Sequence, residues 1–108
     1  MKPIWTEGAI SDWEGIARYI AVNFGKKAFD EYDEETDKAE NQIAEFPGSG
    51  TPLKTRKHSN LGLKFVLISK LSKMIYHSDG ERVIIDVIWD TRQSPKRLSE
   101  RLSKLQTP

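Results

Sequence analysis

The sequence predicts an α+β fold in which two helices cover one face of an antiparallel sheet. Between residues 9 and 46, apolar side chains recur at spacings of three and four, which is typical of amphipathic helices. Farther along, Asp79-Gly80 lies between two apolar runs, and such a dipeptide is the strongest short-range signal for a β-hairpin. Packing a helical hairpin on the sheet would bury both apolar sets.

Length and composition limit what the chain can be. With 108 residues, residues 1–108 are expected to form a single domain. The sequence contains no cysteine, so neither disulfides nor thiolate metal sites support the fold, which is compatible with a reducing cytoplasm. No apolar run approaches the roughly 20 residues of a membrane span, and no signal peptide is recognisable. We expect a cytoplasmic protein with no membrane partner.

The near-neutral net charge of +1 conceals an asymmetry. Residues 1–50 hold five Lys or Arg against eleven Asp or Glu, whereas residues 51–108 hold twelve against five. Such a division suggests an acidic side and a basic side, the latter suited to phosphate or an acidic partner. Solvation of both helices by charges of either sign explains the pattern equally well.

The N-terminal half is predicted to form a short strand and a helical hairpin. Residues 2–5 are expected to be an edge strand, because Pro3 is tolerated only at an edge. Thr6 is the predicted N-cap of the first helix, and Gly25 is predicted to end it in a left-handed conformation. The second helix runs from Lys26 to about Phe46. Its acidic outer face is interpreted as a solvated surface without a metal site.

A loop follows the second helix and carries the densest basic cluster of the chain. Pro47-Gly48-Ser49-Gly50 stops the helix, and the loop extends to about Leu61. The basic cluster comprises Lys54, Arg56, Lys57 and His58. At the end of the chain, a short amphipathic helix is predicted from three leucines on one side: Leu98, Leu102 and Leu105.

The register of the sheet follows from its predicted turns. With Asp79 and Gly80 as a two-residue loop, opposite residues share a face. One face then holds the pairs Tyr76–Val83, Met74–Ile85 and Ser72–Val87. The other holds His77–Arg82, Ile75–Ile84, Lys73–Asp86 and Leu71–Ile88, with Lys73 and Asp86 forming a cross-strand ion pair. A second tight turn at Ser69-Lys70 would place Leu63, Phe65 and Leu67 beside Met74 and Tyr76.

This partition predicts one face under the helices and one that is open. The face toward the helices would contain Leu63, Phe65, Leu67, Met74, Tyr76, Val83, Ile85, Val87 and Trp89, with the Tyr76 hydroxyl hydrogen-bonded inside the core. The opposite face would present Val66, Ile68, Leu71, Ile75, Ile84 and Ile88. So many aliphatic side chains are too large a patch to leave in water. Either the C-terminal leucines or a partner chain is expected to cover them.

Five segments are informative when taken together: Ile4-Trp5-Thr6, residues 16–20 with Phe24-Gly25, the helix stop at residues 46–50, residues 73–76, and residues 83–95. In this order they resemble the RelE/ParE superfamily of bacterial toxins from type II toxin-antitoxin pairs. The resemblance covers nearly the whole chain. The resemblance implies a small α+β toxin of the plasmid-stabilisation type, neutralised by a cognate antitoxin. Such a toxin is expected to need no cofactor. The predicted antitoxin-binding residues are those of the open face: Val66, Ile68, Ile75, Ile84 and Ile88.

Two activities occur in this superfamily, and the sequence favours one of them slightly. RelE-like members cut mRNA in the ribosomal A site, whereas ParE-like members inhibit DNA gyrase. Many RelE-type nucleases carry a catalytic His or Tyr near the C-terminus, but neither residue follows Trp89 here. Gyrase inhibition is therefore favoured over a metal-independent endoribonuclease.

The RNA-cutting class would need a group that activates a ribose hydroxyl, an acid for the leaving oxygen, and cations for the phosphate. The candidate catalytic residues are His77, Arg56 and Arg92. Arg92 is equally well interpreted as a structural partner of Asp90 or Asp86. The candidates for binding the target or nucleic acid are Lys54, Arg56, Lys57, His58, Lys73, Arg82 and Arg92.

Two further functions remain open at this stage. One is a plain nucleic-acid-binding module that uses the basic loop with Arg97, Arg101 and Lys104, although aromatic residues for base stacking are missing among these charges. The other is a toxin that has lost its toxicity and survives as an interaction partner. With its cognate antitoxin, the chain is expected to form a toxin-antitoxin hetero-oligomer.

Overall fold

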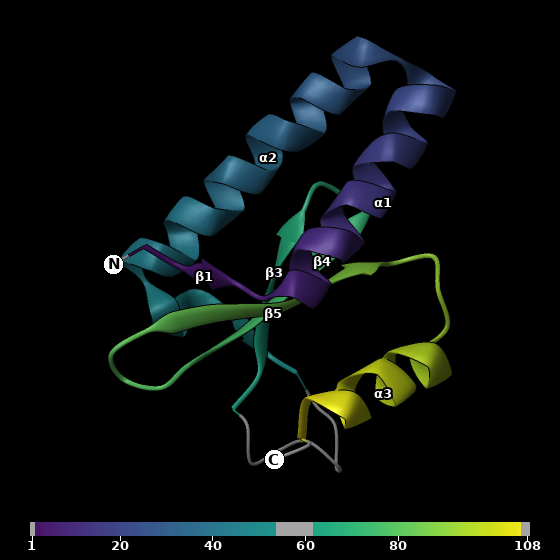
Figure 1. Ribbon diagram of the computed structural model, residues 1–108. Helices are drawn as coiled ribbons and strands as arrows, with labels where there is room; N and C mark the ends of the chain where they lie inside the picture. Colours follow the sequence, from purple (N-terminus) through teal and green to yellow (C-terminus); the bar gives the residue numbers. More distant parts are fainter. Residues whose placement is uncertain (1, 54–61, 107–108) are drawn as a thin grey trace.

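A five-stranded sheet lies beneath a long helical hairpin on one face and a short C-terminal helix on the other (Figure 1). The computed structural model describes residues 2–53 and 62–106. The elements in chain order are β1 (Ile4–Trp5), α1 (Glu7–Phe24), α2 (Lys26–Glu45), η1 (Pro47–Ser49), β2 (Thr51–Pro52), β3 (Lys64–Ile68), β4 (Ser72–Ser78), β5 (Val83–Asp90), α3 (Pro95–Ser103) and η3 (Lys104–Gln106). The sheet order is β1-β5-β4-β3-β2, and only β1 is parallel to its neighbour. The predicted α+β class is confirmed.

The helical hairpin forms as the sequence predicts. The Thr6 hydroxyl caps α1 by accepting a hydrogen bond of 3.1 Å from the backbone N–H of Ala9. Gly25 joins the two helices at φ 89° and ψ 178°, so its φ is positive as expected, although the conformation is not left-handed helical. The tip of the hairpin extends beyond the sheet, as Figure 1 shows. Phe46, the predicted end of the second helix, is the C-cap of α2 and is 59% exposed.

The main core lies between the hairpin and the sheet. Met74, Tyr76, Val83 and Ile85 face the helices and are fully buried, as predicted. Polar groups in this core are paired, which avoids the free-energy cost of burying them unsatisfied. For example, the hydroxyls of Tyr32 and Ser72 lie 2.7 Å apart, and burial raises the pKa of Tyr32 to about 12.

The predicted register between β3 and β4 is wrong by one residue. The turn contains three residues instead of two, because Ile68 pairs with Ser72. Within it, Ser69 takes a positive φ of 55°. A one-residue slip turns every side chain of a strand to the other face. Val66 and Ile68 therefore belong to the core under the helices, and Leu67 is 57% exposed.

The predicted register between β4 and β5 is also wrong. Four residues separate the paired residues Ser78 and Val83, and the register then shifts again at a β-bulge. Tyr76 pairs with Ile85, but its neighbour Ile75 pairs with Val87, so Asp86 is the extra residue. Beyond this bulge the remaining side chains of β5 change faces. Val87 and Trp89 leave the helix side, and Ile88 joins it.

The ion pair predicted between Lys73 and Asp86 does not form. Lys73 lies opposite Trp89, and its ammonium stands 4.4 Å from the centre of the Phe65 ring. The bulge moves Asp86 out of the predicted alignment, where it meets a different side chain, that of His77.

The open apolar face predicted from the sequence is wrong as well. Val66, Ile68 and Ile88 are buried under the hairpin, and Ile75 is buried on the opposite face. Ile84 alone among the five retains partial exposure. The second face forms its own small core of Leu63, Ile75, Val87, Trp89 and Leu102, with Leu53, Phe65, Leu98 and Leu105 packed around it. The C-terminal leucines thus cover this face, which was one of the two outcomes expected.

Thr6, the N-cap of α1, and Asp12 within α1 bind backbone groups along the outer edge of β5. Thr6 donates its backbone N–H to the carbonyl of Ile85, at 3.1 Å, and its hydroxyl to the carbonyl of Asp86, at 3.2 Å. Farther along β5, the Asp12 carboxylate accepts a hydrogen bond from the backbone N–H of Ile88, at 3.1 Å. These contacts occupy backbone groups that an added strand would need. No helix within the described residues is long and apolar enough to cross a membrane.

The strand β2 was not predicted, and Tyr76 accounts for its position. The buried Tyr76 hydroxyl donates to the carbonyl of Pro47, at 2.7 Å, and accepts from the backbone N–H of Gly50, at 3.0 Å. These two bonds hold the segment before β2 against the core, so the expectation of a hydrogen-bonded core tyrosine is confirmed. A Cβ on Gly50 would collide with the Tyr76 hydroxyl and would lie 2.9 Å from its ring.

We predict that Gly50→Ala lowers the free energy of unfolding by about 1 to 3 kcal/mol, because the added methyl group overpacks the site and displaces the Tyr76 hydroxyl. Urea denaturation monitored by circular dichroism measures the change. Gly48→Ala is the matched control, since nothing lies within 4 Å of a Cβ there. Equal stability of the two variants would contradict the role assigned to Gly50.

Candidate functional site

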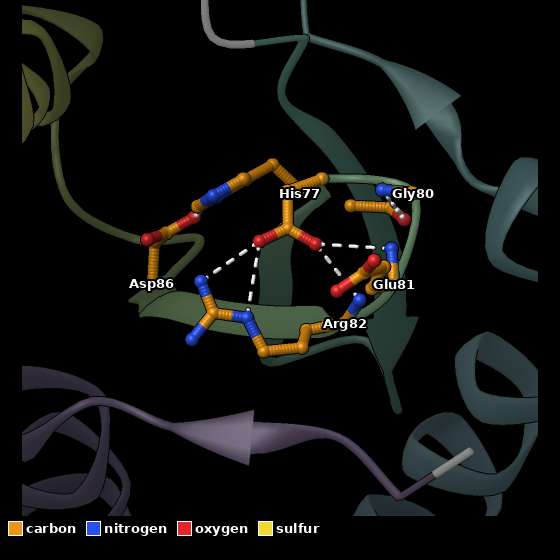
Figure 2. Close-up of polar contacts among 7 residues, drawn as sticks. His77, Gly80, Glu81, Arg82 and Asp86 are labelled. Carbon is orange, nitrogen blue, oxygen red and sulfur yellow. Dashed lines mark hydrogen bonds and ion pairs between the residues drawn. The ribbon is translucent and has the colours of Figure 1, made fainter.

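A histidine–aspartate pair lies on the sheet face opposite the helical hairpin. His77 alternates with the core residue Tyr76 along β4, so its side chain points away from the hairpin. The bulge in β5 presents Asp86 to it, and His77 Nδ1 lies 2.6 Å from Asp86 Oδ2 (Figure 2). Asp86 is largely buried, whereas the imidazole is 24% exposed. The Asp86 carboxylate thereby fixes the orientation of the ring.

The electrostatic environment favours the protonated form of His77. The hydrogen bond to Asp86 raises the pKa of His77, and this effect outweighs the opposing effect of burial. The charge of Asp79 acts in the same direction, and the charge of Arg82 opposes it. A histidine held in this way by a carboxylate can donate or accept a proton near neutral pH.

The turn between β4 and β5 holds its own arginine. Asp79 Oδ1 accepts the backbone N–H groups of Arg82 and Glu81, at 2.8 and 3.1 Å. Its other oxygen accepts two hydrogen bonds from the Arg82 guanidinium, at 3.0 and 2.8 Å. These bonds, first among them that from the Arg82 backbone, lower the pKa of Asp79 to about 2. Figure 2 shows the Arg82 guanidinium hydrogen-bonded within the turn, so its positive charge is neutralised there.

Arg92 is likewise bound by a neighbouring carboxylate. Its guanidinium donates to Asp90 at 3.1 and 2.8 Å, and its backbone N–H donates to the same carboxylate at 2.9 Å. The guanidinium carbon also lies 4.4 Å from the centre of the Tyr19 ring, within cation–π range. The sequence left open whether Arg92 is a catalytic residue or a structural partner of an aspartate. The structure contains the salt bridge to Asp90. The side chain remains 53% exposed.

A second arginine near Arg92 was expected only as a cation of the alternative nucleic-acid-binding module. The Arg101 guanidinium of α3 donates hydrogen bonds to both carboxylate oxygens of Asp12 in α1, at 2.7 and 2.9 Å. The same carboxylate accepts the backbone N–H of Ile88. A cavity of about 490 Å³ lies beside Arg92 and Arg101. Because residues 12 and 101 are far apart in the chain, no local sequence signal connects them. Only the packing of α3 on the sheet brings them together.

Gly8 leaves the space that this ion pair needs. A Cβ at Gly8 would lie 2.7 Å from a guanidinium nitrogen of Arg101. The pair links α3 to both α1 and β5. Its use here also removes Arg101 from the cations available to a nucleic-acid backbone.

The predicted site residues do not all converge. The basic cluster of Lys54, Arg56, Lys57 and His58 lies outside the described residues. Lys73, Arg82 and Arg92 stand on β4, in the β4–β5 turn and after β5 respectively, each with a different local partner. Across the part of the chain that the structure describes, no group of three or more acidic, histidine or cysteine side chains is arranged to hold a metal ion.

Comparisons with known proteins place this geometry in context. A family model described as the ParE toxin of the type II toxin-antitoxin system, parDE, matches residues 4–95. A chain of the chromosomal ParDE toxin-antitoxin system from P. aeruginosa superposes with a TM-score of 0.68, over 83% of this chain and 95% of that chain. The sequence identity is 16%, so this likeness concerns the fold alone. No curated protein matches the sequence at a significant level.

We predict that the His77–Asp86 pair stabilises the fold more at acidic than at alkaline pH. Because the folded-state pKa of His77 is raised above 6.5, the stabilisation is fully present below that value and is lost as the pH rises through the folded pKa. The difference in free energy of unfolding between the native sequence and His77→Gln should therefore be larger at a pH of about 5 than at about 8.5. Urea denaturation at both values measures it.

Asp86→Asn provides the control for the cause of the shift. With the charge removed, an NMR titration of His77 should give a pKa closer to 6.5 than in the native sequence. An unchanged pKa in Asp86→Asn would show that Asp86 is not responsible.

Proposed function

Since this chain belongs to the ParE toxin family of type II toxin-antitoxin systems, we propose that it inhibits DNA gyrase and that a cognate antitoxin neutralises it. The alternative within the superfamily is ribosome-dependent cleavage of mRNA. The arrangement of the predicted cations distinguishes these two targets best.

The observation that carries the gyrase proposal is the dispersal of these cations. Among residues 2–53 and 62–106, Lys73 lies over Phe65, Arg82 is bound by Asp79, and Arg92 is bound by Asp90. A phosphodiester-cleaving site needs cations directed at one developing charge, together with an acid and a base. The described cations instead point to separate local partners. This supports a surface that inhibits its target by binding rather than a cleavage centre.

One observation favours mRNA cleavage as a second candidate function. The bond between His77 and Asp86 leaves the other imidazole nitrogen without a partner among the described residues. A histidine with a raised pKa and a buried carboxylate behind it resembles the acid–base pairs of hydrolytic enzymes. In this function His77 would transfer the proton, and Asp86 would orient the imidazole ring.

Two assays on the purified protein separate these functions. We expect inhibition of gyrase-dependent DNA supercoiling and no cutting of mRNA on programmed ribosomes. His77→Gln should inhibit gyrase as the native sequence does. Cleavage products at A-site codons that disappear in His77→Gln would instead establish the second candidate. Normal growth on expression without an antitoxin, with folded protein present, would indicate a toxin that has lost its toxicity.

The structure buries most of the aliphatic residues predicted to bind the antitoxin, which supports a docking surface elsewhere on the molecule. A groove of about 650 Å³ lies between the β3–β4 turn and the part of the helical hairpin near the α1–α2 connection. Phe24 of α1 and Leu71 of the turn line it and are 64% and 39% exposed. Ile20, Ala28 and Tyr32 contribute further apolar surface. Large exposed apolar side chains that line one groove are typical of a protein-interaction site.

We propose that an apolar segment of the antitoxin occupies this groove, which we call the hairpin-tip groove. Glu31, Glu35 and Lys70 stand among its lining residues. Polar groups around an apolar centre are the usual anatomy of a protein interface. The apolar centre would supply most of the binding free energy, and the charged side chains would favour one orientation of the bound segment.

We predict that Phe24→Ser combined with Leu71→Ser weakens antitoxin binding about 10- to 100-fold, because two exposed anchors are lost. Calorimetry with the protein encoded by the adjacent gene measures the affinity. Growth on co-expression measures neutralisation, which should fail in the variant while toxicity persists. Phe46→Ser is the control, since Phe46 is also exposed but does not line the groove. Equal losses in both variants would place the docking surface elsewhere.

A further inference from the structure

A second pocket lies at the other end of the hairpin and combines indole rings with carboxylates. Its volume is about 250 Å³, and it lies between β1, the first turns of α1 and the middle of α2. The lining residues are Trp5, Ile10, Trp13, Asp33, Thr36, Asp37 and Glu40. None of them takes part in the His77 pair or in the hairpin-tip groove.

The two indole groups are held in place by hydrogen bonds across elements. Trp5 Nε1 donates to Glu40 Oε2 at 3.1 Å, and Trp13 Nε1 donates to Thr36 Oγ1 at 2.8 Å. The Trp13 ring also stacks on Tyr32, with centroids 6.0 Å apart and an interplanar angle of 24°. With their N–H groups occupied, the rings can offer a visiting group only π-electron surface. Indole is the aromatic group that attracts cations best.

Among the described residues, no basic side chain forms an ion pair with the carboxylates of this pocket. Within the described residues, Asp33 and Asp37 form no ion pair and are exposed to solvent. Elsewhere on the same helix, Lys26 pairs with Asp30, and Lys38 lies near Glu34 and Glu35. Asp33 and Asp37 are four residues apart, so their charges repel one another on one face of α2. A bound cation would relieve that repulsion.

The size of the pocket favours a single side chain as its occupant. Sites for whole small molecules usually span about 300 to 1,000 Å³, so this volume is below the usual range. Arginine fits the lining chemistry best, because its planar guanidinium stacks on aromatic rings and donates in pairs to carboxylates. Ile10, which is 44% exposed, adds apolar surface for the arginine methylenes or for a neighbouring residue.

We propose that this pocket binds an arginine side chain presented by a protein partner. Recognition combines stacking against Trp5 or Trp13 with hydrogen bonds to Asp33 and Asp37. The acidic N-terminal half of the chain thereby acquires a recognition role of its own, independent of whether the target is gyrase or mRNA. Failure of the gyrase assay would leave this proposal unaffected.

The test uses the full chain labelled with ¹⁵N and the probe Nα-acetyl-L-arginine amide. The sequence contains three tryptophans, so three indole N–H signals are expected, and Trp89→Phe identifies the one outside the pocket. We expect the signals of Trp5 and Trp13 to shift saturably, with a dissociation constant of about 1 to 10 mM, while that of Trp89 stays in place. Absence of a saturable shift at both pocket signals would overturn the proposal.

A matched pair of variants tests the carboxylates. Asp33→Asn with Asp37→Asn should weaken binding by about tenfold or more, because both charged acceptors are lost. Glu34→Gln with Glu45→Gln removes the same charge from α2 outside the pocket and should change the affinity by less than about twofold. Equal weakening in the two variants would reduce the effect to the overall charge of the helix and overturn the proposal.

Further probes test the nature of the occupant. Nα-acetyl-L-leucine amide should leave both signals in place, and Nα-acetyl-L-lysine amide should bind more weakly than the arginine probe, since an ammonium lacks the planar fork. Stronger binding of spermidine than of the arginine probe would assign the pocket to a free polyamine and overturn the proposal. Dispersed spectra of each variant confirm that the fold is retained.

Discussion

The β-bulge in β5 is the constraint on which the rest of this structure depends. Asp86 is one additional residue in β5, and because of it Ile85 faces the hairpin whereas Val87 faces α3. The first half of β5 therefore supplies the core beneath the hairpin, and most of the second half supplies a core beneath α3. Without the bulge, Val87 and Trp89 would compete for space under the hairpin, and the core beneath α3 would lose both side chains.

The same bulge determines the chemistry of the candidate site. It offsets Asp86 from the regular alternation and brings its carboxylate to His77, which sits on the neighbouring strand. The adjoining turn binds Arg82 through Asp79, and Arg92 is bound through Asp90. Each of these arginines is thus neutralised by an aspartate two or three residues away. Such local pairing rigidifies the turn and the segment after β5, and it disperses positive charge that a nuclease would need to concentrate.

The helical hairpin offers two surfaces of different chemistry at its two ends. The hairpin-tip groove is mainly apolar and is bordered by charges of both signs. The indole–carboxylate pocket at the opposite end is acidic and aromatic. Because α1 and α2 pack on the sheet through only part of their surfaces, both ends remain available.

Elements with local signals could be predicted from the amino-acid sequence. Thr6, Gly25 and the helical spacing of apolar residues specified the hairpin, and its bounds agree closely with those predicted. The Asp79-Gly80 pair located the β4–β5 turn, and the three C-terminal leucines indicated a short amphipathic helix. The resemblance to the RelE/ParE superfamily also followed from sequence, because its segments recur in order along nearly the whole chain.

The facing of the remaining sheet residues depends on tertiary structure, although Met74, Tyr76 and Ile85 were placed correctly from the sequence. Turn length and the bulge each change the register by a residue, and the energetic differences that select them come from packing against the hairpin and α3. Hence Val66, Ile68 and Ile88 were placed on the wrong face, and the contacts of Asp86 with His77 and of Asp12 with Arg101 could not be foreseen. Apolar alternation identifies a strand, but both faces of this sheet are buried, so alternation could not tell one face from the other.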